Sequence, residues 1–196
     1  MTPDEFKADL DRSLDVLARC TSAPILGFRA PSFSVTRRTW WAFDILASRG
    51  LRYDSSVFPV GFHPDYGVPD APLEPYPVGD MLEIPMSCAR LMGCNVPCCG
   101  GAYFRTYPYA LTRRLMQACN REGRPTIFYM HPWEVDPDQP RVGGLPVGKR
   151  FRHYNNLEKT LPRLEKLLED FRFVALRTLF RENLVSTKSP AAANGR

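Results

Sequence analysis

Long hydrophobic runs are absent from this sequence, since no apolar stretch approaches the ~20 residues of a membrane-spanning helix. Runs of like charge are absent as well. The 26 basic and 21 acidic residues are scattered and leave a net charge of +5, which argues against a nucleic-acid-binding protein. The same balance would suit an anionic polysaccharide or an acidic partner, and charge alone does not choose between them. Acidic residues at positions 4, 5 and 9 argue against a signal peptide, and the sequence assigns no compartment.

Metal-binding motifs are also absent. The three histidines lie far apart, and neither H-x-x-x-H nor H-E-x-x-H occurs. The six cysteines lack C-x-x-C spacing, and the adjacent pair Cys98 and Cys99 is poorly placed to ligate one tetrahedral ion. We therefore expect no self-contained metal site, and we interpret the cysteines as small buried thiols in a reducing compartment. A disulfide that involves Cys94 is the alternative for an exported protein.

What is present is an alternation of helical and strand-like segments. The 196 residues, of which 44% are hydrophobic, have room for one domain with a sizeable core. Helical spacing with capping or stop residues predicts helices at about residues 3–17, 36–48, 108–123 and 161–171. Short apolar runs predict strands at 25–30, 51–57, 81–87, 126–131 and 173–179. The order strand, helix, strand in residues 25–57 indicates an α/β protein with a parallel sheet or barrel.

Proline and glycine are frequent in residues 58–105, where no helical period occurs. We expect an irregular insertion with short hairpins there. Gly100 and Gly101 predict a tight turn that leads into an extended segment. Residues 181–196 are expected to form a frayed tail.

His131 is the strongest candidate for a catalytic residue. It ends the apolar run Thr126–Met130 and precedes Pro132, which stops strand pairing and turns the chain outward. Polar groups released at strand ends are how α/β folds build their sites. A histidine that only completes the core is the alternative, but the position at the end of a strand favours a function.

Arg29 and Asp54 are the next candidates. Arg29 follows a short apolar segment and precedes Pro31, so within a sheet it would need a carboxylate partner. A catalytic role and a structural ion pair explain this equally well. Asp54 could orient a histidine, or it could cap the turn that it makes with Ser55 and Ser56.

Aromatic and acidic side chains surround these strand ends. The aromatic residues pack in a core by default but could also stack on sugar rings; they are Phe33, Tyr103, Phe104 and Trp133. An acidic cluster is either a solvated turn or a partner for carbohydrate hydroxyls; it comprises Glu134, Asp136 and Asp138. His63 and His153 are loop histidines to which the sequence assigns no role.

Five blocks of sequence carry a resemblance: Gly27–Ser34, Tyr53–Ser56, Gly100–Arg105, Tyr129–Glu134 and Arg150–Tyr154. In this order they resemble the polysaccharide deacetylases of the NodB-homology type. The branch they resemble most is found in exopolysaccharide loci of bacteria with the PEP-CTERM sorting system. The agreement runs from about residue 2 to about residue 180, and five blocks in order are more specific than any one of them.

The resemblance implies a deformed (β/α) barrel and a zinc-dependent amidohydrolase that removes acetyl groups from an N-acetylated polysaccharide. Arg29 and Pro31 match the family's Arg-x-Pro motif, in which the arginine holds the catalytic base. Asp54 matches an Asp-rich motif loosely, because the tryptophan that often follows is absent. Tyr129 and His131 match Leu-x-His, with tyrosine in place of the leucine that lines the acetyl pocket.

By this resemblance His131 would protonate the departing amine, while Arg29 and Asp54 would set charge and orientation. Residues in or beside the matched motifs are expected to contact the polysaccharide: Pro31, Ser32, Phe33, Tyr103, Arg105, Tyr129, Trp133 and Glu134.

Two motifs of the family are missing from the sequence. One is an Asp-Asp pair that gives the base and a zinc ligand, and the other is the H-x-x-x-H that gives two further ligands. We therefore interpret residues 1–180 as the C-terminal two-thirds of such a deacetylase domain, with an incomplete barrel. Zinc, the family's cofactor, then has no ligands in this chain, and the chain alone is expected neither to bind zinc tightly nor to release acetate.

Two other interpretations remain open. The chain could be a noncatalytic carbohydrate-binding relative that kept the groove without the metal. It could also be a different hydrolase that uses Ser55 or Ser56 with His131, although no G-x-S-x-G motif supports this.

Overall fold

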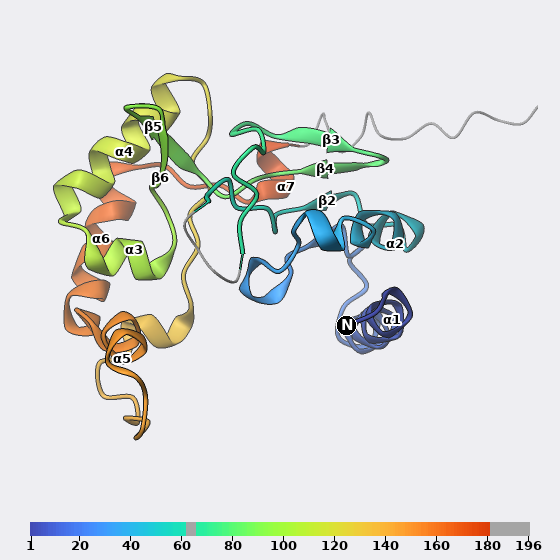
Figure 1. Cartoon of the computed structure of the whole chain (residues 1–196), viewed down its shortest axis with the longest axis horizontal. Helices are drawn as coiled ribbons and strands as arrows, with labels where there is room; N and C mark the ends of the chain where they lie inside the picture. Colours follow the sequence, from blue (N-terminus) through green and yellow to red (C-terminus); the bar gives the residue numbers. More distant parts are fainter. Residues whose placement is uncertain (62–65, 181–196) are drawn as a thin grey trace, which may run out of the picture. The chain divides into compact units, whose positions relative to one another are not determined.

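The computed structural model of the chain describes residues 1–61 and 66–180 and shows a mixed α/β fold (Figure 1). It divides into two compact units, which are described one at a time: Met1–Pro85 with residues 175–180, and Met86–Val174. The α/β class is confirmed. The strands of the described residues form a four-stranded and a two-stranded sheet rather than a closed barrel, so the barrel itself is not confirmed. The predicted tail and His63 lie outside the described residues.

The first unit is built on a small mixed sheet with strand order β1-β2-β4-β3. Its strands are β1 (Gly27–Phe28), β2 (Tyr53–Asp54), β3 (Tyr76–Val78) and β4 (Met81–Glu83). β1, β2 and β4 are parallel, and β3 pairs antiparallel with β4. The three parallel strands lie within the three segments predicted from residues 25–87, and each is shorter than predicted.

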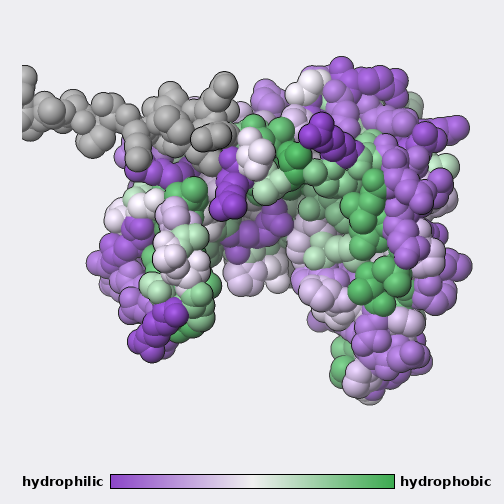
Figure 2. Space-filling model, turned by 180° about the vertical axis from the view of Figure 1, so that it is seen from behind, coloured by the Kyte–Doolittle hydropathy of each residue, from purple (hydrophilic) through white to green (hydrophobic). Residues whose placement is uncertain are grey.

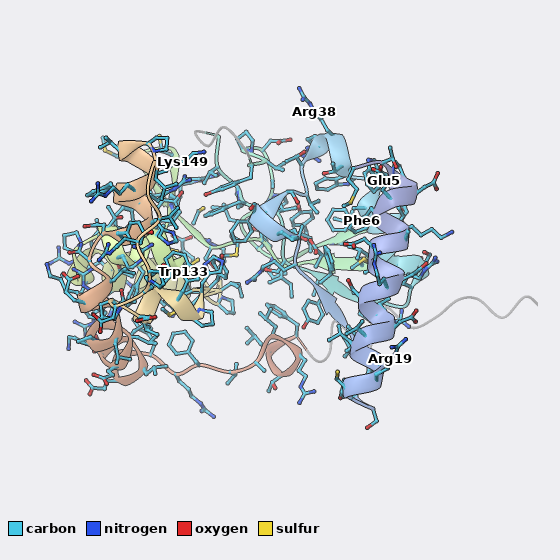
Figure 3. The ribbon with its side chains drawn as sticks, turned by 90° about the horizontal axis from the view of Figure 1, so that it is seen from below. Glu5, Phe6, Arg19, Arg38, Trp133 and Lys149 are labelled. Atoms are coloured by element: carbon cyan, nitrogen blue, oxygen red, sulfur yellow. The ribbon has the colours of Figure 1, made fainter. Side chains whose placement is uncertain are left out.

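Helices α1 (Pro3–Cys20) and α2 (Ala42–Ser48) belong to the same unit, as do two short 3-10 turns, η1 (Pro31–Phe33) and η2 (Arg37–Thr39). Thr2 and Glu5 form the predicted capping box at the start of α1. Phe6 points from α1 toward the sheet, where its ring lies 5.8 Å from Phe28 and 5.6 Å from Trp41 (Figure 3). The described core of this unit therefore lies between α1, α2 and the strands.

The strand predicted at residues 173–179 is wrong. Residues Leu176–Leu179 form a helical turn, α7, instead. Leu176 and Leu179 are spaced three residues apart, which places them on one face of a helix and on opposite faces of a strand, but a short apolar run does not by itself distinguish the two.

The second unit combines a hairpin with helices. The hairpin pairs β5 (Cys88–Leu91) with β6 (Cys94–Pro97), which confirms a short hairpin in the proline-rich region. Three longer helices follow: α4 (Tyr109–Arg121), α5 (Val147–Tyr154) and α6 (Thr160–Asp170). Shorter helical elements are α3 (Gly101–Thr106), η3 (Pro132–Val135) and η4 (Leu157–Lys159). Predicted helices at 108–123 and 161–171 are confirmed, whereas α5 was not foreseen.

Two further predictions in this unit need correction. Gly100 does form a turn, with φ 106°, but it leads into the helix α3 rather than into an extended segment. Residues 126–131 have no strand pairing in the structure. Side chains hold this segment instead: Ser87 Oγ accepts from the N–H of Ile127 at 2.8 Å, and Asn120 Oδ1 accepts from that of Thr126 at 3.1 Å.

The surface mixes polar and apolar groups. Figure 2 shows hydrophobic side chains gathered over the second unit among hydrophilic ones. Large apolar residues exposed in that unit include Val147, Phe151, Leu161 and Leu168. Among the residues that the structure describes, no helix is long and apolar enough to cross a membrane.

Candidate functional site

A buried ion pair lies at the centre of the site in the second unit. Arg105 Nε donates to Glu134 Oε2 over 2.7 Å, and each side chain is 2% exposed. The other two guanidinium nitrogens donate to the carbonyls of Arg152, His153 and Asn155, at 2.9, 3.1 and 2.8 Å. Each nitrogen of Arg105 thus has at least one acceptor for the buried charge.

Glu134 lies directly against Gly101, the first residue of α3. A Cβ atom added to Gly101 would overlap both carboxylate oxygens of Glu134. Gly100, with its positive φ, provides the left-handed backbone conformation that turns the chain into α3. The pair of glycines therefore has two separate roles, a turn at position 100 and space for a carboxylate at position 101.

Glu134 also holds His131. Its Oε1 accepts from the backbone N–H of His131 at 3.0 Å and lies 3.2 Å from His131 Nδ1. The hydroxyl of Tyr129 lies 2.7 Å from His131 Nε2. The imidazole is 49% exposed while the carboxylate behind it is buried, so the ring is oriented from inside the protein and open to solvent outside.

Trp133 lies between two histidines. Its ring stacks on His131 at 5.4 Å and 23°, and on His153 at 4.3 Å and 19°. The guanidinium carbon of Arg105 lies 5.4 Å from the same indole ring. Burial lowers the pKa of His153, and the nearby charge of Arg105 lowers it further. His153, placed on α5, therefore favours the neutral form in this stack.

The other aromatic candidates of this unit differ from one another. Phe104 is 1% exposed and belongs to the core of the unit, as the default interpretation predicts. Tyr103 is half-buried on α3, and its ring and that of Tyr129 both lie beside Gly100. Asp136 and Asp138 are exposed, which fits the solvated-turn interpretation for these two acids, whereas Glu134 is buried.

In the first unit, Arg29 connects the ends of β1 and β2. Its Nε donates to the carbonyl of Ser55 at 2.8 Å, and its Nη2 donates to Ser55 Oγ at 2.7 Å. Ser55 Oγ in turn donates to the carbonyl of Ile84, just beyond β4, at 2.7 Å. Arg29 therefore binds three strand ends together through one serine.

Asp54 faces a second carboxylate that the sequence reasoning missed. Asp54 and Glu83 are direct partners in the parallel pairing of β2 and β4, and both are 0% exposed. Burial raises the pKa of Asp54. Burial raises the pKa of Glu83 well above its usual range, the charge of Asp54 adds to this shift, and the charge of Arg29 opposes it. Two buried acids this close share a proton rather than ionise together.

The hydrogen bonds of Asp54 fit the turn-capping alternative. Ser56 donates to Asp54 twice, from its N–H at 2.9 Å and from its hydroxyl at 2.8 Å. The N–H of Val57 donates to Glu83 Oε1 at 2.9 Å. Glu83 Oε2 meets no ordinary donor within the described ranges, and a proton shared with Asp54 would satisfy it.

The two serines proposed as nucleophiles have structural partners. Ser56 Oγ accepts from the N–H of Ala30 at 2.7 Å and donates to Asp54, while Ser55 Oγ bridges Arg29 and Ile84. Both serines are buried. This engagement argues against the hydrolase that would use either serine as its nucleophile.

The turn after Arg29 is strained. Ser32 and Phe33 have φ values of 55° and 53°, which are uncommon for residues other than glycine and which recur at functional sites. Phe33 is 8% exposed and packs edge-on against Phe58. Phe33 is thus a core residue, while Pro31 and Ser32 are exposed.

The described residues do not fit the zinc ion that the resemblance implies. No group of three or more His, Cys, Asp or Glu side chains among residues 1–61 and 66–180 could hold a metal ion. The predicted residues fall into two sets, each within its own unit: Arg29 with Asp54, and Arg105 with Tyr129, His131, Trp133 and Glu134. Glu83 and Gly101 belong to these sets but were not predicted. The signal that could have revealed Glu83 is its position as the one acid inside the apolar run Met81–Met86.

Comparison with known families gives one match. Residues 55–181, more than half of the chain, match the family described as "Domain of unknown function (DUF3473)". Neither the curated proteins nor the solved structures gave a match. The match includes Ser55, Ser56 and the whole site around His131. Because it covers more than half of the chain, the chain belongs to the DUF3473 family.

Proposed function

We propose that the protein acts in the N-deacetylation of an amino-sugar polysaccharide, with His131 as the general acid that protonates the nitrogen leaving group. One observation carries this proposal: a half-exposed imidazole whose inner nitrogen lies against a buried carboxylate. The resemblance of Tyr129–Glu134 and Gly27–Ser34 to deacetylase motifs supports the reaction class.

The contacts of His131 suit proton donation. The Glu134 carboxylate lies 3.2 Å from Nδ1 on the inner side of the ring, so that Nε2 is the nitrogen available to a substrate. The Tyr129 hydroxyl lies beside Nε2. The leaving nitrogen of a substrate would have to bind at the position of this hydroxyl. Arg105 holds the Glu134 carboxylate in place through its hydrogen bond. Of the parts that amide hydrolysis requires, this unit therefore supplies the proton for the departing amine.

By the motif match alone, Arg29 and Asp54 would set charge and orientation in the family's reaction, while their contacts in the first unit are those that hold strand ends together. Because the donor set does not fit zinc, no step is assigned to a metal here. We expect the purified chain to retain no stoichiometric zinc and to release no acetate from an N-acetylglucosamine oligomer. Stoichiometric zinc together with turnover would contradict that expectation.

Substrate recognition can be tested without turnover. In a W40F/W41F variant, Trp133 is the only tryptophan left, so its fluorescence reports on the site. Titration with an N-acetylglucosamine oligomer should give a saturable change, and a glucose oligomer of equal length should give none, because it lacks the acetamido group. The further substitution H131A should abolish or weaken the response at least tenfold, whereas L168A, at an exposed position of α6, should leave it unchanged.

A second candidate function is noncatalytic carbohydrate binding. The stack of His131, Trp133 and His153 favours it, because flat rings bind sugar faces, and so does the misfit of the donor set with zinc. Equal affinity for the two oligomers would support this candidate against the deacetylase. No saturable response to either oligomer would contradict both candidates.

A further inference from the structure

Four buried cysteines gather in the second unit, and the proposed function uses none of them. They are at most 1% exposed and lie around the hairpin and α4: Cys88, Cys98, Cys99 and Cys119. All six cysteines of the chain are described and are free thiols; Cys20 and Cys94 are exposed. The four buried cysteines are therefore available to react with one another but not with a second molecule of the protein.

Cys98 and Cys119 are the closest pair. Their sulfur atoms lie 3.6 Å apart, in van der Waals contact, although the residues are 21 positions apart in sequence. Both belong to one small apolar cluster with Ala89 and Leu115. A disulfide requires the sulfurs to approach further, to about 2 Å.

The surroundings of the pair favour a thiolate on Cys119. The contact with the Cys98 thiol lowers the pKa of Cys119, while burial opposes that shift and the charge of Arg124 reinforces it. Arg124 is held in place by the carbonyl of Cys88 at 3.0 Å and by Glu122. Because the thiolate is the reactive form of cysteine, Cys119 is the sulfur that would react first.

The other cysteines are less well placed to form the bond. Cys99 directs its sulfur to the carbonyl of Ser87 at 3.4 Å. Cys88 meets Cys119 through its backbone carbonyl, at 3.5 Å, rather than through its sulfur. A bond between the adjacent residues Cys98 and Cys99 would close a strained ring. The sulfur contact of 3.6 Å therefore favours Cys98 with Cys119 as the pair.

We propose that Cys98 and Cys119 are a redox modification site that forms a reversible disulfide when the protein reacts with a peroxide. The Cys119 thiolate attacks one peroxide oxygen, the O–O bond breaks, and the departing oxygen leaves as water after it takes up a proton. The Cys119 sulfenic acid is then attacked by the Cys98 sulfur, which displaces the hydroxyl as a second water with the proton of Cys98. Two thiols are oxidised by two electrons, one peroxide is reduced, and a thiol reductant reverses the bond.

The bond would form beside the segment that carries His131. It would close a loop that contains α3, with Gly101 and Arg105. The carbonyl of Ser87 accepts from the thiols of Cys98 and Cys99, and the hydroxyl of the same serine holds Ile127. Oxidation is therefore expected to restrict the movement of residues 126–131 relative to α4.

The test uses a C20S/C94S variant, which removes the two exposed thiols. The reduced protein is treated with hydrogen peroxide, digested and mapped by mass spectrometry. We expect one linked peptide pair, Cys98 with Cys119, which dithiothreitol separates. The melting temperature of the oxidised protein should exceed that of the reduced protein by roughly 5–10 °C, because the cross-link restricts the unfolded chain.

Variants identify the pair. C88A and C99A, in the same background, should still form the link, whereas C98A and C119A should not. If one of these variants does not fold, the peptide map of the wild-type protein still identifies the linked pair. Oxidation of Cys119 to sulfinic acid without a link, a link between any other pair, or a link that lowers the melting temperature would each overturn the proposal.

Discussion

The buried acids of the two units have opposite kinds of partner. In the first unit, Asp54 and Glu83 face each other inside the sheet and are satisfied by serine and backbone donors. In the second, Glu134 faces Arg105 and supports a histidine that is half open to solvent. The first arrangement raises the pKa of both acids, whereas the second pairs its acid with a guanidinium group. The comparison indicates that the Asp54 region holds strand ends together, whereas the Glu134 region presents a titratable group.

The largest effect should come from breaking the ion pair of the second unit. Replacing Arg105 with methionine leaves Glu134 buried without a cation, which costs about 3–5 kcal/mol. The double variant R105M/E134Q should recover part of that loss. Urea unfolding followed by circular dichroism measures both. As a control, R12M removes an exposed pair with Asp9, whose side chains are 75% and 57% exposed, and should cost less than about 1 kcal/mol. Equal losses from R105M and R12M would contradict the comparison.

Filling the space beside Glu134 should have the next largest effect. In G101A the added methyl group displaces the carboxylate from Arg105 and His131, and we expect a loss of about 1–3 kcal/mol. G148A is the matched control, because nothing lies within 4 Å of a Cβ at that position of α5. The stabilities of the two alanine variants are compared by urea unfolding. A G101A protein as stable as G148A would show that the carboxylate can move freely.

In the first unit, Ser56 is the matching target. S56A removes the acceptor of the Ala30 N–H and one of the two hydrogen bonds that Ser56 donates to Asp54. We expect a loss of about 1–3 kcal/mol in chemical denaturation. Ser13, which donates to a backbone carbonyl on the exposed face of α1, is the control, and S13A should change stability by less than about 0.5 kcal/mol. Comparable losses in the two variants would mean that the buried network is unimportant.

The smallest effect, and the one that depends on pH, should come from Glu83. Its pKa in the folded protein is raised above the ordinary 4.5 by burial and then by Asp54. A group with a raised pKa contributes most below pH 4.5, and that contribution is lost as pH rises. The E83Q variant keeps an acceptor for Val57 but cannot ionise. The melting temperature of the wild type should therefore fall relative to that of E83Q between pH 5 and pH 8. Parallel melting curves across that range would contradict the raised pKa.

Sequence alone predicted the parts of this protein that depend on local pattern. The capping box at Thr2 and Glu5 and the apolar stripe on α4 follow from spacing that is readable without a structure. His131 was identified from its place at the end of an apolar run, and the structure gives it a buried carboxylate. These predictions rest on neighbours in the chain.

Long-range partners could not be predicted. The pairing of Asp54 with Glu83 depends on which strands become neighbours, and Gly101 meets Glu134 only after α3 and η3 have packed. Residues 126–131 have a strand-like composition but are held by the side chains of Ser87 and Asn120, so tertiary contacts override the local preference. The deacetylase assignment rests on motif order and stays a prediction.

The direct opposition of Asp54 and Glu83 also bears on how the sheet is assembled. Successive side chains of a strand alternate between its two faces, so a slip of one residue between β2 and β4 would send the two acids to opposite sides. Each would then be enclosed without the other and could no longer divide one proton between them. The acid pair thereby disfavours misaligned strands during folding. Hydrophobic side chains of similar size on both faces would distinguish the correct register less well.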